Sequence, residues 1–418
     1  MRFPGRKPDV ARRRRVVAVD ESHKVTPFEL FFDLVFVFVM TQVTAYMAHD
    51  PSTVRVLEGM VILGVLWWSW TAYSWLGAVA RADEGASRLL FVIAMGAVLV
   101  LALAIPEAFH VRPEHVGVPG ELYPPMVVAL CVVLVRLVHF VAFWIAADED
   151  TGLKRQLLRF AVPQATGSVL LLISAFAPDE FRVWLWAAAL IADLLLTQLI
   201  GAAGWRLRSV GHFAERHGLI IIIALGESIV AVGVGVQDKA TTLPVVLAAT
   251  LSLLIVGSLW WAYFDLVAPF AERLLHGLTG KARMALARDS YSYLHLPMVA
   301  GIILLALGLK KVLTAVGEPE HAWEEHLHGP GAVALVLGPA LYLLGHIAFR
   351  LRNRRSLNKH RTVVVVLLLA AIPVVELVPA FTALAGVATL LALMIGYEAV
   401  AHREMRISLR QELVHGSD

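Results

Sequence analysis

Charged residues and cysteine are both scarce in this sequence. Aspartate, glutamate, lysine and arginine together make up 17% of the 418 residues, whereas soluble globular proteins carry about 25%. This composition argues against a soluble globular protein. The single cysteine, Cys131, has no partner for a bridge, so a disulfide framework is excluded.

Catalytic and targeting motifs are also missing. The sequence contains no GxGxxG, GxxxxGK[ST], HExxH, CxxC or GxSxG motif, and it has no soluble segment large enough for a nucleotide site. We therefore expect no enzyme activity, no catalytic residues and no cofactor. Two histidine-containing loops, 107–117 and 318–329, fit no standard metal-site spacing, so we expect solvated loops and no metal. The basic N-terminus continues into a polar stretch at 20–24, which indicates that no signal peptide is present.

Long apolar runs dominate what is present. Hydrophobic residues make up 58% of the chain, and the mean hydropathy is +0.72. Runs of about 20 apolar residues can cross a hydrocarbon core of about 30 Å. The sequence therefore predicts an all-α polytopic membrane protein with about twelve transmembrane helices. The predicted spans are 28–48, 56–79, 88–108, 124–147, 157–178, 183–204, 217–236, 244–266, 291–313, 331–352, 360–381 and 383–401.

Basic residues alternate between the connections of these spans. Arginine and lysine gather before the first span and in every second connection, including the stretches 206–216 and 350–359, while the intervening connections hold few of them. Lys310 and Lys311 are a notable exception. The positive-inside rule then places both termini in the cytoplasm, with the chain in the cytoplasmic membrane. The basic run Arg12–Arg15 would meet anionic lipid, and nucleic acid is not expected as a partner.

The chain also repeats its own pattern. His23 precedes Asp33 by ten residues (33 − 23), and His217 precedes Glu227 by ten (227 − 217). Tryptophan pairs follow at 67–68 and 260–261, and a similar His/Phe pattern recurs at His139 and His346. These matches predict two parallel six-helix repeats related by an axis along the membrane normal. The predicted parts are a basic tail 1–25, the first repeat 26–208, the second repeat 209–404 and a cytoplasmic tail 405–418.

Two acids interrupt the first apolar run. Glu29 and Asp33 are four residues apart and share one helix face, and Glu227 takes the place of Asp33 in the second copy. Ten residues of helix rise about 15 Å, which puts Asp33 and Glu227 near the bilayer midplane. An acid at that depth costs about 2.5–3.5 kcal/mol on insertion scales, so it should face protein or water.

Two interpretations of these acids stay open. Each acid could tie its helix to a neighbour through a hydrogen bond or an ion pair. Alternatively, the acids could bind a cation or a proton between the two repeats, which is the interpretation we favour.

Other polar residues lie deep in the predicted spans. Arg136 and Asp193 have matching depths, so we expect them to form an ion pair, with Asp33 as the second choice of partner. His139 and His346 are either hydrogen-bonded core residues or part of a proton path. Trp67 and Trp260 lie too deep for an interfacial belt and either pack between helices or line a cavity.

Two of these segments carry a family resemblance. "TPFELFFDLVFVFV" near the N-terminus and "HGLIIIIALGES" far downstream resemble the bacterial low temperature requirement protein A family, and the similarity covers nearly the whole chain. The resemblance implies an integral membrane protein associated with growth in the cold. The matching motif residues are Thr26, Pro27, Glu29, Leu30, Phe31, Phe32, Asp33, His217, Gly218, Leu225, Gly226, Glu227 and Ser228.

These observations favour a proton- or cation-coupled secondary transporter with midplane acids. A two-repeat cation channel, or a membrane sensor or enzyme without a recognisable catalytic motif, is the alternative. The expected partners are the lipid bilayer and a small ion or small-molecule substrate, and a homo-oligomer is compatible with the sequence. The candidate binding residues are Glu29, Asp33, Glu227, Ser228, Arg136, His139, Asp193, His346, Trp67 and Trp260.

Overall fold

The computed structural model is helical, and it describes residues 24–112, 116–318, 320, 322–401 and 403–404. The predicted tails 1–25 and 405–418 therefore lie almost entirely outside the described residues. Among those described, eleven helices are long and apolar enough to cross a membrane. The chain is thus a multi-pass membrane protein built from helices, as its composition predicts.

Contacts divide the chain into two units. Among the described residues, unit 1 comprises 24–39 and 65–216, and unit 2 comprises 40–64 together with the residues after 216. Three helices contribute residues to both units: α1 (Pro27–His49), α2 (Thr53–Gly77) and α7 (Val210–Gly235).

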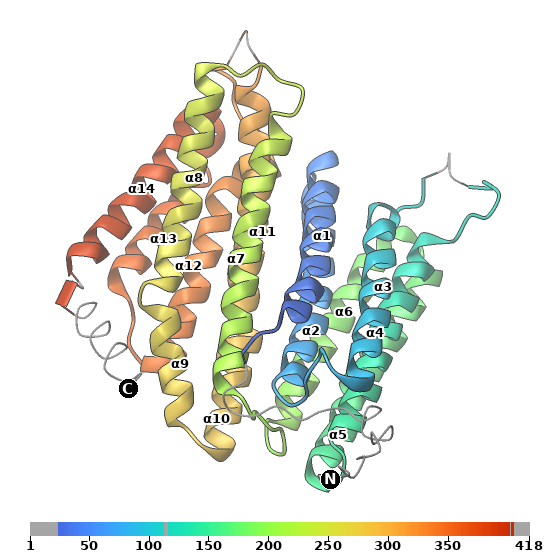
Figure 1. Ribbon diagram of the computed structural model, residues 1–418. Coiled ribbons are helices and arrows are strands. Elements are labelled where there is room, and N and C mark those ends of the chain that lie inside the picture. Colours follow the sequence, from blue (N-terminus) through green and yellow to red (C-terminus); the bar gives the residue numbers. More distant parts are fainter. Residues whose placement is uncertain (1–23, 113–115, 319, 321, 402, 405–418) are drawn as a thin grey trace, which may run out of the picture. The chain divides into compact units, whose positions relative to one another are not determined.

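Unit 1 also contains four helices of its own (Figure 1). They are α3 (Gly85–Ala104), α4 (Pro124–Ala146), α5 (Thr151–Phe176) and α6 (Asp179–Ile200). Consecutive helices pack as neighbours, α3 on α4, α4 on α5, and α5 on α6. Local signals set their ends: Asp150 caps α5 by accepting a hydrogen bond from the Leu153 backbone N–H at 2.9 Å, and Gly201 ends α6 with a positive φ of 80°.

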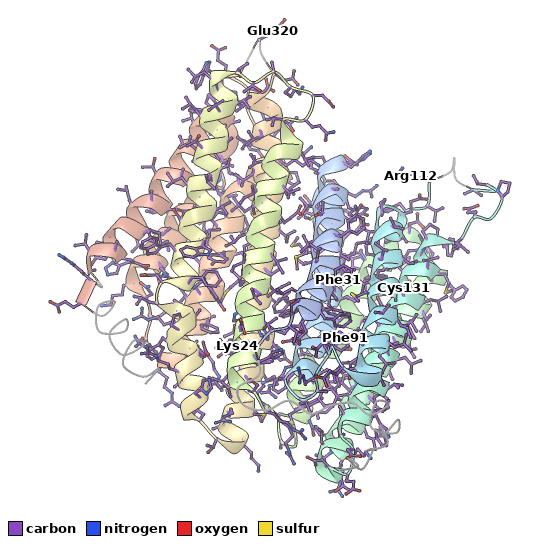
Figure 2. The ribbon with its side chains drawn as sticks, in the orientation of Figure 1. Lys24, Phe31, Phe91, Arg112, Cys131 and Glu320 are labelled. Carbon is purple, nitrogen blue, oxygen red and sulfur yellow. The ribbon has the colours of Figure 1, made fainter. Side chains whose placement is uncertain are left out.

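The inner part of α1 packs into unit 1 through aromatic rings. Phe32 is fully buried, and its ring centroid lies 5.1 Å from that of Phe91 on α3 and 5.0 Å from that of Tyr73 on α2. Phe31, the residue before it on α1, is 56% exposed (Figure 2). The helix therefore has one packed face and one outward apolar face, as expected for a helix that borders lipid.

Unit 2 contains the remaining helices (Figure 1). They are α8 (Leu243–Phe264), α9 (Val267–Gly277), α10 (Gly280–Leu286), the π-helix η4 (Ala287–Tyr293), α11 (His295–Val316), α12 (Pro330–Arg354), α13 (Lys359–Ala371) and α14 (Ala380–Ala401). Here α11 packs on α12, α12 on α13, and α8 on α14.

The α11–α12 contact brings two backbones close together. A Cβ atom added to Gly301, Gly308 or Gly338 would lie about 2.5 Å from a backbone nitrogen of the facing helix. Glycines allow such close approach between membrane helices, where van der Waals packing replaces a hydrophobic driving force.

The predicted span 360–381 is not one long helix. The structure places only 13 residues in α13, followed by a turn and the short 3-10 helix η5 (Val375–Leu377). Thirteen residues of helix rise about 20 Å, less than a hydrocarbon core. Pro373 explains the break, because proline has no N–H to donate to the carbonyl of Leu369.

The chain after α12 nevertheless runs back along the full length of that helix. Asn358, beside the C-terminal end of α12, donates a hydrogen bond to Glu398 near the end of α14 at 3.3 Å. At the other end, the backbone N–H of Gly329, which precedes α12, donates to Glu376 at 2.8 Å. The segment between Asn358 and Glu376 thus connects the two ends of α12.

Candidate functional site

The acids of α1 belong to a buried ion cluster in unit 1, which we define as Glu29, Asp33, His212 and Arg216. Asp33 is fully buried, and its Oδ1 pairs with the Arg216 guanidinium and accepts a hydrogen bond from Trp70 Nε1 at 2.8 Å. Both oxygens of Glu29 contact His212 Nε2, at 2.9 and 3.0 Å, and Arg216 Nη1 lies 3.8 Å from its Oε1.

The spacing of these residues explains why two acids stand four residues apart in a run of apolar residues. Glu29 and Asp33 lie on one face of α1, and His212 and Arg216, also four apart, lie on one face of α7. The two acids of α1 therefore face the two basic residues of α7 at the same spacing, His212 against Glu29 and Arg216 against Asp33. Gly77 of α2 leaves the necessary room, since a Cβ there would lie 2.7 Å from Glu29 Oε1.

This cluster corrects one sequence-based expectation. The pattern of basic residues places Arg216 in a cytoplasmic connection, but α7 begins at Val210 and Arg216 is fully buried. Arg216 is also an ion-pair partner of Asp33, whose role as a cation site stays a prediction. For Asp33 the structural interpretation, an ion pair between helices, is the one that the contacts support.

The predicted pairing of Arg136 with Asp193 is confirmed. Arg136 of α4 forms an ion pair with Asp193 of α6, and the two side chains are 5% and 0% exposed. Arg136 Nη1 also donates to the carbonyl oxygen of Gln164 on α5 at 2.9 Å, so three helices meet at this arginine. Gly167 lies against the pair, because a Cβ there would be 2.7–2.9 Å from the charged atoms.

His139 lies one turn after Arg136 on α4 and is 2% exposed. Its ring contacts Tyr73, Phe143 and Phe160, with centroid distances of 5.4, 5.6 and 6.4 Å. The histidine is therefore enclosed by aromatic rings within unit 1.

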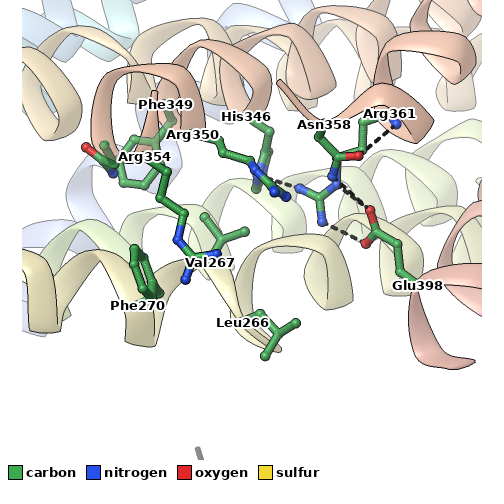
Figure 3. Close-up of a pocket in the computed structure, with 11 residues that line it drawn as sticks. Leu266, Val267, Phe270, His346, Phe349, Arg350, Arg354, Asn358, Arg361 and Glu398 are labelled. Atoms are coloured by element: carbon green, nitrogen blue, oxygen red, sulfur yellow. Dashed lines mark hydrogen bonds and ion pairs between the residues drawn. The ribbon is translucent and has the colours of Figure 1, made fainter. Parts of the chain in front are cut away.

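Unit 2 contains a third buried arginine–carboxylate pair, which the sequence did not indicate. Arg361 of α13 binds Glu398 of α14 through two bonds, Nε to Oε1 at 2.8 Å and Nη2 to Oε2 at 2.9 Å. Arg361 Nη1 also donates to Nδ1 of His346 at 3.0 Å (Figure 3). Each unit thus holds an arginine–carboxylate pair close to one of the two histidines, His139 and His346, that recur in the sequence.

Histidine and tyrosine side chains continue from His346 in a row through unit 2. The ring of Tyr263 lies 5.7 Å from His346, and the Tyr263 hydroxyl contacts His295 Nε2 at 2.8 Å. The His295 ring in turn lies 5.3 Å from His217 of α7. We call His346, Tyr263, His295 and His217 the histidine–tyrosine row.

The π-helix η4 supports this row. His295 Nδ1 donates to the carbonyl oxygen of Ser290 within η4 at 3.0 Å, so its Nε2 is the nitrogen that accepts from Tyr263. π-helices are rare and frequently occur at functional sites. The local residue pattern of η4 resembles that of an ordinary helix, so it could not be recognised from the sequence.

Glu227 has a different environment from Asp33. It lies on α7 and is 2% exposed. Its Oε2 accepts a hydrogen bond at 2.5 Å from Oγ1 of Thr41, and both residues belong to unit 2. Within the described part of the chain, no basic side chain approaches its carboxyl group within 4.0 Å. The neighbouring Ser228 is fully buried and donates to the carbonyl oxygen of Ile302 at 3.4 Å. Glu227 is therefore a buried acid held by a hydroxyl group, and the positive charge of Lys310 on α11 acts on it from beyond ion-pair distance.

The two tryptophans that were matched in the sequence have unlike surroundings. Trp67 is 2% exposed, with its ring centroid 5.1 Å from that of Trp70. Trp260 is 45% exposed and stacks on Phe264 at 5.4 Å. Trp67 is thus a packed core residue, while Trp260 lies on an outer face, so their expected equivalence is not seen in their burial.

These features define a class: an all-helical, multi-pass membrane protein with charged side chains buried among its helices. The sequence profile of the bacterial low temperature requirement A protein (LtrA) family matches residues 24–396. The chain belongs to this family. It is also similar to the uncharacterized protein RA0937 of Rhizobium meliloti (strain 1021), with 29% identity over 390 residues that cover 90% of this chain and 89% of the relative. No solved structure matches the chain.

Proposed function

We propose that this LtrA-family protein is a proton- or cation-coupled secondary transporter and that Glu227 is its coupling residue. The observation that carries the proposal is the position of Glu227, a buried acid that lies within a membrane-spanning helix and has no basic partner within 4.0 Å among the described residues. Ionisable groups inside spans are costly and are commonly part of ion or proton pathways. Asp33, by contrast, is neutralised by Arg216.

The histidine–tyrosine row supports a proton as the coupling ion. Imidazole and phenol groups can each donate and accept a proton, and the row ends at His217, ten residues before Glu227 on α7 (227 − 217). The row and Glu227 lie in the same unit. Protons passing along the row would reach the helix that carries the coupling acid.

A parallel repeat of six and six helices is part of the same proposal. It is supported by the carboxylates of two buried ion pairs. Asp193 lies on α6, the last helix that belongs wholly to unit 1, and Glu398 lies on α14, the last long helix among the described residues. The segment from Asn358 to Glu376 supports a twelfth crossing, made by α13 and the irregular chain after it. An even number of crossings would put both termini on the same side of the membrane. The basic residues in the connections assign this side to the cytoplasmic face of the inner membrane.

Flux through the purified protein in liposomes tests this function. We expect saturable uptake of one member of a panel of cations that is driven, and reversed, by an imposed pH gradient. Protein-free liposomes provide the background. A non-saturable flux that follows the membrane voltage and ignores the pH gradient would contradict a transporter and indicate a cation channel. No flux of any panel member in either direction would remove the support for transport.

A further inference from the structure

A cavity in unit 2 contains two arginines, Arg350 and Arg354, that the proposed transport function does not use. It has a volume of about 90 Å³ and lies between α9, the C-terminal half of α12, the start of α13 and the end of α14. Its lining includes three arginines, Arg350, Arg354 and Arg361, together with His346 and apolar side chains such as Phe270 (Figure 3). We call it the arginine cavity.

Two arginines of this cavity have no carboxylate partner in the part of the chain that the structure describes. Arg350 and Arg354 lie four residues apart on α12, and among the described residues no carboxylate oxygen lies within 4.0 Å of either guanidinium. Arg350 Nε donates to the Ser356 hydroxyl at 3.2 Å, and Arg354 lies 3.4 Å from the ring centroid of Phe270. Like charges at this spacing destabilise a helix, and a shared anion would relieve that repulsion.

The acid that lines the cavity cannot supply this anion. Glu398 uses both of its oxygens to bind Arg361, at 2.8 and 2.9 Å, and Figure 3 shows Arg361 lying between His346 and Glu398. The lining therefore keeps an excess of two positive charges, from Arg350 and Arg354.

His346 adds a buried donor to the lining. Because the guanidinium of Arg361 can only donate, Nδ1 of His346 must accept, and its proton resides on Nε2. This Nε2–H is buried on a side chain that is 1% exposed, and no acceptor for it lies among the described residues. A buried donor without an acceptor is unfavourable, so a ligand with acceptor oxygens would satisfy it.

We propose that the arginine cavity binds a phosphate group, either the phosphodiester of an anionic lipid headgroup or a free phosphate ion. Phosphate oxygens match the forked donors of arginine, and two guanidiniums can share one phosphate. Leu266, Val267 and Phe270 form an apolar wall beside the arginines, which suits the glycerol and first acyl carbons of a lipid. Basic pockets between membrane helices commonly take such headgroups.

Native mass spectrometry of the full chain in detergent tests this site. The probes are phosphatidylglycerol, diacylglycerol with the same acyl chains, and inorganic phosphate. Arg350→Gln and Arg354→Gln should each weaken phosphate-dependent binding by about fivefold, the effect expected for one arginine near an anionic lipid. The matched control is Arg352→Gln, because Arg352 is on the same helix segment but binds Asp289 at 3.0 Å outside the cavity.

The probes separate the two sources of phosphate. Preferential binding of phosphatidylglycerol over diacylglycerol, weakened by the two cavity variants and not by Arg352→Gln, supports a lipid headgroup; the same pattern with inorganic phosphate alone supports a free ion. Equal loss in all three variants, or no loss in any, would overturn the proposal. If a glutamine variant fails to purify as a monodisperse protein, Arg350→Lys and Arg354→Lys replace it, and binding unchanged in both lysine variants would also overturn a site that depends on the arginine fork.

Discussion

Replacing Asp193 by asparagine should strongly destabilise unit 1. The substitution leaves Arg136, 5% exposed, with its positive charge and with only neutral partners such as the Gln164 carbonyl. Removing one member of a buried ion pair costs about 3–5 kcal/mol. At about 2–4 °C per kcal/mol, the melting midpoint of the detergent-purified protein should fall by roughly 6–20 °C.

Asp150→Asn is the matched control for this prediction. Asp150 pairs with Arg206 at 3.0 Å, but these side chains are 29% and 45% exposed, and exposed pairs contribute only about 0–1 kcal/mol. Asparagine at this position still caps α5. The double variant Arg136→Met with Asp193→Leu should recover most of the lost stability, because an apolar pair of similar volume replaces a buried ion pair at little cost. Equal melting midpoints for Asp193→Asn and Asp150→Asn would refute the reasoning.

Three further predictions concern packing and topology. Gly338→Ala should lower the melting midpoint, since its methyl group would meet backbone atoms of α11 at 2.5–2.8 Å, whereas Gly386→Ala on α14, with no atom within 4 Å, should not. Gly77→Ala should similarly destabilise the buried ion cluster, and its control is Gly96→Ala, whose methyl group would meet no atom within 4 Å. If the two variants of either pair lowered the melting midpoint equally, the close approaches would be contradicted. A reporter enzyme that is active only in the cytoplasm should be active when it is fused to either end of the chain. Activity of a reporter that works only outside the cytoplasm, at either end, would overturn the proposed topology.

Hydropathy could predict the membrane class and most of the spans, because a helix must be apolar over about 20 residues to cross a bilayer. It could not predict the short α13, since the residues around Pro373 remain apolar where the helix stops. Depth in the membrane was enough to pair Arg136 with Asp193, because a buried charge needs a partner at its own level.

The remaining site residues were missed for one physical reason. His212 and Arg216 lie near the start of α7, and Arg361 near the start of α13, where a basic residue in a sequence resembles the positive end of a loop. Only the packing of neighbouring helices shows that all three side chains are buried. The sequence repeat likewise matched Asp33 with Glu227 by position, but position alone does not show that Arg216 neutralises the first of them.

The most direct test of the proposed mechanism compares Glu227→Gln with Asp33→Asn in stability and in ion-coupled flux. Glutamine has almost the same shape as glutamate and keeps an acceptor oxygen for the Thr41 hydroxyl. The free energy of unfolding of Glu227→Gln should therefore lie within about 1 kcal/mol of that of the natural protein. The variant should nevertheless lose coupled flux in liposomes. Asp33→Asn should instead lose stability, because it removes the main charge partner of the fully buried Arg216. Normal coupled flux in stably folded Glu227→Gln protein would contradict the assignment of Glu227 as the coupling residue.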